Sequence, residues 1–131
     1  MNPPSQDIKD ILEAADLNLT FQSNLFIGSL PAQAQDNCVV IYDTPGYSPD
    51  LTFNFGEKYF RPSIQIMVRS RDYQTGYSLI NSIKNELHGI GHEVWNGTVY
   101  ELIKCTQEPF LLSYDERNLV QFICNFDIQR H

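Results

Sequence analysis

Residues 63–71 read Ser-Ile-Gln-Ile-Met-Val-Arg-Ser-Arg, and this stretch decides the fold class. Ile64, Ile66 and Val68 alternate with mostly polar residues, which is the pattern of a β-strand with one apolar face. Pro62 lies just before the strand or at its first residue, where a missing N–H donor is tolerated. We therefore predict a strand over this stretch that packs one face against a core.

The residues after this strand predict the main helix. Apolar side chains recur at three- and four-residue steps at Tyr73, Tyr77, Ile80, Ile83 and Leu87. Asp72 is a good N-cap, and Gly89 and Gly91 are suited to end a helix. Inside the helix, Gly76 costs about 1 kcal/mol relative to alanine unless another backbone passes close to it. We expect this helix to cover about residues 72–88.

A second, N-terminal helix is expected over about residues 5–16. It carries one apolar stripe, formed by Ile8, Ile11, Leu12 and Ala15. Ser5 is the predicted N-cap. Asp7 lies in the first turn, where the helix dipole favours a negative charge.

The remaining segments read as strands and turns. The strand candidates are residues 25–28, 38–42, 91–95, 98–105, 110–112 and 119–128, and the aromatic stretch 51–59 is ambiguous. Asn96-Gly97 favours a two-residue hairpin turn. Because runs of strands follow a single central helix, we predict an α+β fold in one domain over residues 1–131. We expect a single mostly antiparallel or mixed sheet of five to six strands, with both helices packed on it.

Residues 43–50, Asp-Thr-Pro-Gly-Tyr-Ser-Pro-Asp, are expected to form a loop. Two prolines and a glycine give strong turn chemistry. The stretch has no catalytic signature. It is either an ordinary surface loop or a docking loop, since binding residues concentrate on loops held by rigid strands.

The charge of the chain limits its partners. Nine Lys and Arg residues stand against sixteen Asp and Glu residues, for a net charge of −7. Tight binding of nucleic acid needs clustered cations, and so does an anionic membrane surface. The composition therefore argues against both, although it allows DNA to pass nearby without binding. No apolar run is long enough to span a membrane.

No motif points to catalysis, a cofactor or a metal. The sequence lacks a Gly-x-Ser-x-Gly elbow, a Gly-x-Gly-x-x-Gly fingerprint and a phosphate-binding loop. His88 and His92 have the spacing of a helical metal pair, but two glycines interrupt them and no third ligand is near in sequence. The three cysteines, Cys38, Cys105 and Cys124, are expected to be buried thiols. An enzyme could arise only from residues distant in sequence.

Arg69 and Arg71 lie on one face of the predicted strand, because residues two apart point the same way. One interpretation is that both are solvated, with Asp72 as a local partner. The other is that they pair with the acidic edge of a neighbouring subunit.

Three consecutive features form one pattern: the segment 38–46, Cys-Val-Val-Ile-Tyr-Asp-Thr-Pro-Gly, then residues 59–69, then the helix that begins at Asp72-Tyr73. This pattern resembles the tail terminator or minor capsid proteins of long-tailed phages. These are also called tail-completion or tail-to-head joining proteins. The resemblance is strongest over residues 38–90. Two features differ from the family pattern, namely Pro45, where relatives often have glycine, and the long aromatic stretch 51–59.

This resemblance implies a virion protein without enzymatic activity, assembled in the host cytoplasm. It implies a homohexameric ring that caps the tail tube, joins it to the head-tail connector and lets DNA pass through its lumen. The candidates for inter-subunit or docking contacts are Asp43, Pro45, Tyr47, Arg61, Arg69 and Arg71. The alternatives are another joining or tail-tube component of the same machine, or a small non-viral ligand-binding or enzymatic α+β domain.

Overall fold

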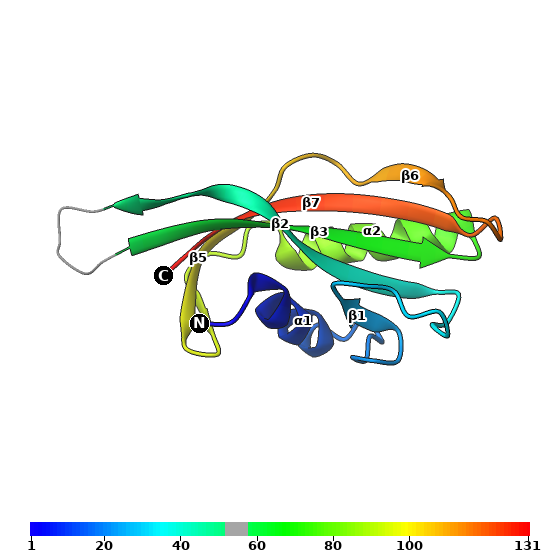
Figure 1. Ribbon diagram of the computed structural model, residues 1–131, viewed down its shortest axis with the longest axis horizontal. Coiled ribbons are helices and arrows are strands. Elements are labelled where there is room, and N and C mark those ends of the chain that lie inside the picture. The colour runs from blue at the N-terminus through cyan, green and yellow to red at the C-terminus, as the bar shows by residue number, and fades with distance from the viewer. Residues whose placement is uncertain (52–57) are drawn as a thin grey trace.

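The computed structural model describes residues 1–51 and 58–131, which form one sheet with two helices (Figure 1). The elements are α1 (Pro4–Ala14), β1 (Leu25–Ile27), β2 (Cys38–Leu51), β3 (Lys58–Ser70), α2 (Tyr73–Leu87), β4 (Glu93–Trp95), β5 (Thr98–Cys105), β6 (Phe110–Tyr114) and β7 (Val120–Arg130). The strand order is β1-β2-β3-β7-β5-β4, and β6 pairs with β7. Only the β1–β2 pair is parallel among these strands. The α+β class is confirmed, with seven strands in the described residues where five to six were expected.

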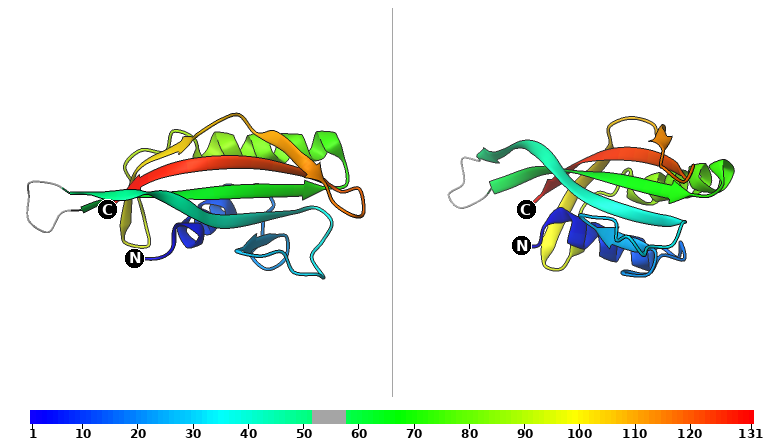
Figure 2. Two further views of the ribbon diagram at one scale, coloured as in Figure 1. Left: turned by 45° about the horizontal axis from the view of Figure 1, so that its top comes forward. Right: turned by 45° about the vertical axis from the view of Figure 1, so that its right-hand side comes forward.

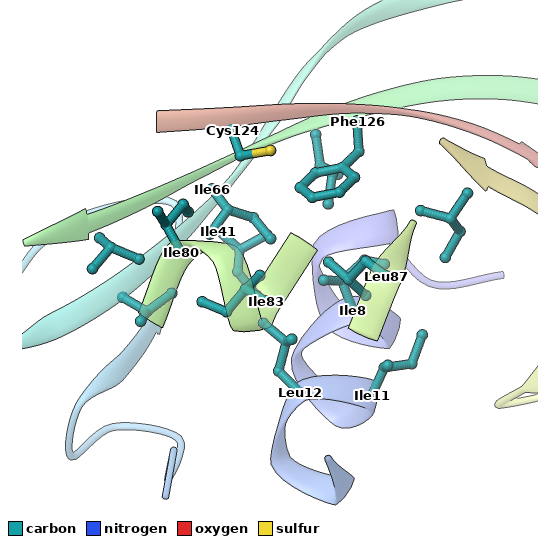
Figure 3. Packing of buried hydrophobic residues seen from close by; sticks show 14 of the residues in the cluster. Ile8, Ile11, Leu12, Ile41, Ile66, Ile80, Ile83, Leu87, Cys124 and Phe126 are labelled. Carbon is teal, nitrogen blue, oxygen red and sulfur yellow. The ribbon is translucent and has the colours of Figure 1, made fainter. Parts of the chain in front are cut away.

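The main core lies between one face of the sheet and both helices (Figure 3). A smaller apolar cluster on the other face contains Phe26, Cys38, Val40, Met67 and Ile123. The alternation predicted for β3 is confirmed, since Ile64, Ile66 and Val68 are fully buried on the face that the helices cover. They stand opposite Phe126, Cys124 and Phe122 of β7, respectively. The helices contribute Ile8, Leu12, Ile80, Ile83 and Leu87. Each such side chain stabilises the fold by roughly 1.5–3 kcal/mol before conformational entropy is subtracted.

Helix α2 begins as predicted, because the Asp72 side chain accepts a hydrogen bond of 2.8 Å from the Thr75 N–H. The apolar stripe of this helix predicts that Tyr73 and Tyr77 are buried with Ile80, Ile83 and Leu87, and for the two tyrosines this prediction is wrong. Both are about half exposed and make T-shaped contacts with the Phe122 ring instead of joining the core. Gly76 is explained by side chains, not by a backbone, because a Cβ there would lie 2.9 Å from the Cβ of Ser70.

Helix α1 begins at Pro4, and Ser5 is not its N-cap, so that prediction is wrong. The N-cap position is Pro3, which has no side-chain hydrogen bond to offer. The carboxylate of Asp43, a residue of β2, takes the place of an N-cap side chain. It accepts hydrogen bonds from the Ser5 N–H at 3.0 Å and from the Ser5 hydroxyl at 2.7 Å. A negative charge near the first turn of a helix is favourable, so this contact ties α1 to the sheet.

The prediction of a loop over residues 43–50 is wrong, because β2 continues as a strand to Leu51. Two register shifts against β3, between Thr44 and Tyr47 and between Tyr47 and Asp50, accommodate the prolines and the glycine. Of the ambiguous stretch 51–59, residues 52–57 lie outside the described part of the chain.

The cysteines meet the prediction in part. Cys38 and Cys124 are buried, whereas Cys105 is partly exposed. The Sγ atoms of Cys105 and Cys124 lie 3.3 Å apart, because β5 pairs with β7. Burial raises the pKa of the Cys124 thiol, and its contact with Cys105 adds to the rise.

Candidate assembly surfaces

A hairpin arm projects from one end of the sheet (Figure 2). We define it as residues 44–51 of β2 and 58–62 of β3. Strand β7 pairs with β3 no further than Phe60, and β1 pairs with β2 only over Val39–Ile41. Within the described residues, the outer part of the arm therefore has no other strand beside it.

The two strands of the arm are packed unusually closely at Gly46. A Cβ atom on Gly46 would lie 2.2 Å from the carbonyl oxygen of Arg61 and 2.7 Å from the Cα of Pro62. Only glycine fits such an approach of two backbones. An ion pair of 2.9 Å between Nε of Arg61 and Oδ2 of Asp50 bridges the same two strands. The arm is therefore held in shape by its own contacts.

The arm brings together three of the predicted docking residues. Pro45, Tyr47 and Arg61 line one hollow of about 460 Å³ at the arm. The side chains of Tyr47 and Leu51 are 65% and 85% exposed. Asp43, the fourth candidate in this region, lies at the base of the arm and holds Ser5 of α1. Docking roles for these residues stay a prediction.

A buried polar network lies near the base of the arm. The carboxylate of Asp7 is fully buried and accepts hydrogen bonds from the Tyr100 hydroxyl and, at 2.7 Å, from Asn96 Nδ2. The Nη1 atom of Arg130 lies 3.2 Å from the Tyr100 hydroxyl and 3.8 Å from Asp7. Burial, and then the bond to Asp7, raise the pKa of Tyr100. The sequence explains Asp7 by the helix dipole alone, because its partners Asn96, Tyr100 and Arg130 lie 89, 93 and 123 residues further along the chain.

Arg69 and Arg71 lie at the opposite end of β3 from the arm, in an ion cluster that we define as Asp36, Arg69, Arg71, Asp115 and Arg117. Arg69 is buried and donates to the carbonyl oxygens of Gln35 and Asp36 at 2.8 and 3.1 Å, so a solvated Arg69 is excluded. Arg71 pairs with Asp36 at 2.6 Å, not with Asp72. Its side chain is still 75% exposed, so pairing with a neighbour stays a prediction.

This ion cluster is expected to make stability depend on pH. The hydrogen bond from Arg117 and the charge of Arg117, followed by the charge of Arg71, hold the pKa of Asp36 below its usual value of 3.8. A carboxyl group with a lowered pKa stabilises the fold above its ordinary pKa, and this contribution is lost as the pH falls through the lowered value. Asp36→Asn should therefore lower the melting temperature at pH 7, and the difference from the wild type should narrow as the pH falls below about 4.

Thermal unfolding of the two proteins between pH 7 and pH 3 measures this effect. Salt is the control, because partly exposed ion pairs are screened at high ionic strength. A difference in melting temperature that stays constant with pH and salt would contradict the role given to Asp36.

A second group of exposed apolar side chains lies on β6 and at the start of α2. We call it the aromatic edge, and its residues are Tyr73, Tyr77, Leu111, Leu112 and Tyr114, all between 39% and 55% exposed. In register, Leu111 stands opposite Phe122, whose ring Tyr73 and Tyr77 contact. Among the strands of residues 1–51 and 58–131, β6 pairs with β7 alone. The sequence pattern missed this surface, because it assigned both tyrosines to the core.

His88 and His92, which have the spacing of a metal pair, contact different partners. His88 Nδ1 accepts a 2.9 Å hydrogen bond from the Cys105 N–H, and His92 Nδ1 lies 3.3 Å from Glu101. Over residues 1–51 and 58–131, no three His, Cys, Asp or Glu side chains gather as a metal site would require. Neither helix of these ranges has the length and apolar character needed to cross a membrane.

The sequence matches a family model described as bacteriophage tail terminator protein over residues 8–130. The chain belongs to this tail terminator family. It is therefore a structural protein of a phage tail and a component of the virion. A solved structure described as the virion of a native gene transfer agent particle contains a chain of the same fold, with a TM-score of 0.69 at 11% identity, covering 96% of this chain and 92% of that one. A search of curated proteins finds no match.

Family membership confirms the resemblance inferred from residues 38–90 and extends it over nearly the whole tail terminator chain. It favours a phage tail protein over a non-viral ligand-binding or enzymatic domain. The surfaces described above are then candidates for contacts with other proteins of the tail.

Proposed function

We propose that this protein forms a closed homohexameric ring that ends the tail tube and joins it to the head-tail connector, without catalysing a reaction. The family match over residues 8–130 carries this proposal. On this view the protein works as an assembly part, built in the host cytoplasm, whose partners are further copies of itself, the tail tube protein and the connector protein.

The shape of the subunit supports a ring. Identical subunits that meet head to tail need two different contact surfaces, and the contacts close into a ring when the rotation per subunit divides a full turn. The chain presents two unlike apolar surfaces, the hairpin arm and the aromatic edge. A stable contact between two copies would bury about 1,600 Å².

The charge of the chain suits a ring around DNA. With a net charge of −7, the subunit repels phosphate more than it attracts it. Near the arm, the sheet face without helices is polar, with hydrogen bonds between Ser63 and Asp127 at 2.7 Å and between Gln65 and Asn125 at 3.0 Å. The rest of this face carries a buried apolar cluster that includes Val40, Met67 and Ile123. We propose that DNA passes through the lumen without specific binding.

Native mass spectrometry of the purified protein, with and without tail tubes, tests the proposal. We expect one discrete assembly, six times the mass of the chain, and electron microscopy should show it as a single ring on tube ends. An open polymer of growing length would indicate a tube protein instead. A monomer under both conditions would contradict ring formation.

A further inference from the structure

We propose that Cys105 and Cys124 are a redox pair, which stays reduced inside the cell and closes to a disulfide bond when the protein meets oxidising surroundings. Disulfide bonds persist outside cells and are rare in the cytosol. A virion protein is made inside a cell and carried outside it, so it meets both conditions. This inference goes beyond the proposed ring and does not depend on it, because the pair lies within one chain.

The two sulfur atoms are already in contact. The Sγ atoms of Cys105 and Cys124 lie 3.3 Å apart, because β5 pairs with β7 and both side chains lie on the sheet face that the helices cover. A disulfide bond is about 2.05 Å long, so the sulfur atoms need to approach by about 1.3 Å. Cys105 is the last residue of β5, and residues 106–109 belong to no strand. A rotation of the Cys105 side chain with a small shift at this strand end is therefore enough to close the bond.

Cys105 is the thiol of this pair that a dissolved oxidant can reach. It is partly exposed, whereas Cys124 is fully buried. Cys105 also lines a hollow of about 320 Å³ together with Lys84, His88 and Glu108. A small molecule in this hollow meets one sulfur atom and not the other. This is the arrangement of an attacking thiol with a resolving thiol next to it.

Cys38 has no part in the pair. It is buried in the smaller apolar cluster on the other face of the sheet, whose other members carry no thiol. Burial raises the pKa of the Cys38 thiol, which lowers the fraction of reactive thiolate. Cys38 is therefore an internal reference for the chemistry of the other two cysteines.

The oxidant is a low-molecular-weight disulfide, such as glutathione disulfide. Cys105 loses its proton and attacks one sulfur of glutathione disulfide, which releases one glutathione. Cys124 then loses its proton and attacks the sulfur of Cys105, which releases the second glutathione. The two cysteines lose two protons and two electrons, and the two glutathione molecules gain them. Burial and the contact with Cys105 raise the pKa of the Cys124 thiol, so we expect its attack to be the slower step.

The disulfide bond would restrain β6. Cys105 precedes β6 and Cys124 follows it, so the bond would close the chain into a loop that contains this strand. Closing a loop of about 20 residues stabilises a fold in the chain-entropy model, because the unfolded chain loses conformational freedom. We expect oxidation to raise the melting temperature by about 10 °C. Amide hydrogen exchange of residues 106–119 should become slower.

Oxidation of the purified protein tests the pair. We would equilibrate the protein in glutathione buffers that range from fully reduced to an oxidising poise of about −180 mV, and then unfold it with an alkylating reagent present. The wild type should change from three alkylated cysteines to one, and peptide mapping should find Cys105 joined to Cys124. The melting temperature should rise over the same range of buffers.

Two variants make the test specific. Cys105→Ser changes a partly exposed side chain, so it should keep the fold by circular dichroism but show no rise in melting temperature on oxidation. Cys38→Ala should show the same rise as the wild type, measured against its own reduced form. Three alkylated cysteines in every buffer, a glutathione that stays attached to Cys105, or dimers joined through Cys105 would each overturn the proposal. A disulfide bond that changes neither the melting temperature nor hydrogen exchange would overturn the role given to it at β6.

Discussion

Replacing Asp7 by asparagine is expected to lower the free energy of unfolding by about 3–5 kcal/mol, because removing one member of a buried ion pair leaves the other charge uncompensated. Asp7 is fully buried, and Arg130 is 7% exposed beside it. In a domain of this size the melting temperature should fall by about 10–20 °C. Chemical denaturation and thermal unfolding of the purified variant measure both quantities.

Asp10 supplies a matched control for this experiment. It also accepts a hydrogen bond from Asn96, at 2.8 Å, but its side chain is partly exposed and pairs with Lys9. Asp10→Asn should therefore cost less than about 1 kcal/mol. The double variant Asp7→Asn/Arg130→Met should recover part of the loss, since it removes both buried charges. An Asp7→Asn variant as stable as Asp10→Asn would show that the network contributes little.

Replacing Gly46 by alanine is expected to abolish assembly while leaving the body of the subunit folded. The added Cβ would overlap the backbone of Arg61 and Pro62, neither of which can swing away as the end of a side chain can. The two strands of the arm must then separate, and the Asp50–Arg61 ion pair is lost with them. We expect about 1–3 kcal/mol of destabilisation and a loss of rings of more than tenfold.

Native mass spectrometry measures the fraction of rings, and circular dichroism measures the fold. Gly91→Ala is the control, because a Cβ there would lie 3.6 Å from the carbonyl oxygen of Glu101, which is an ordinary van der Waals contact. It should assemble like the wild type. Normal rings from Gly46→Ala would contradict the importance of a well-formed arm.

Together these variants distinguish residues that stabilise the fold from residues that are expected to support assembly. The network of Asp7, Tyr100 and Arg130 joins α1 to β5 and β7, so its loss should weaken the fold itself. The arm lies beyond the core, so its loss should weaken assembly first. The proposed ring would need both, because a contact between subunits can only be as well defined as the subunit that presents it.

The sequence by itself determined the α+β class, a strand around residues 63–70, the Asp72-capped helix and the family, although β3 begins earlier, at Lys58. These follow from periodicity and local capping, which act over a few residues and can be read along the chain. Only the tertiary structure decided that residues 43–50 form a strand, because their partner is β3 and a paired strand overrides local turn chemistry. It also decided that Asp43 caps α1, that Asp7 meets Arg130 and that Arg69 is buried, since charges distant in sequence become partners only when the sheet brings them together.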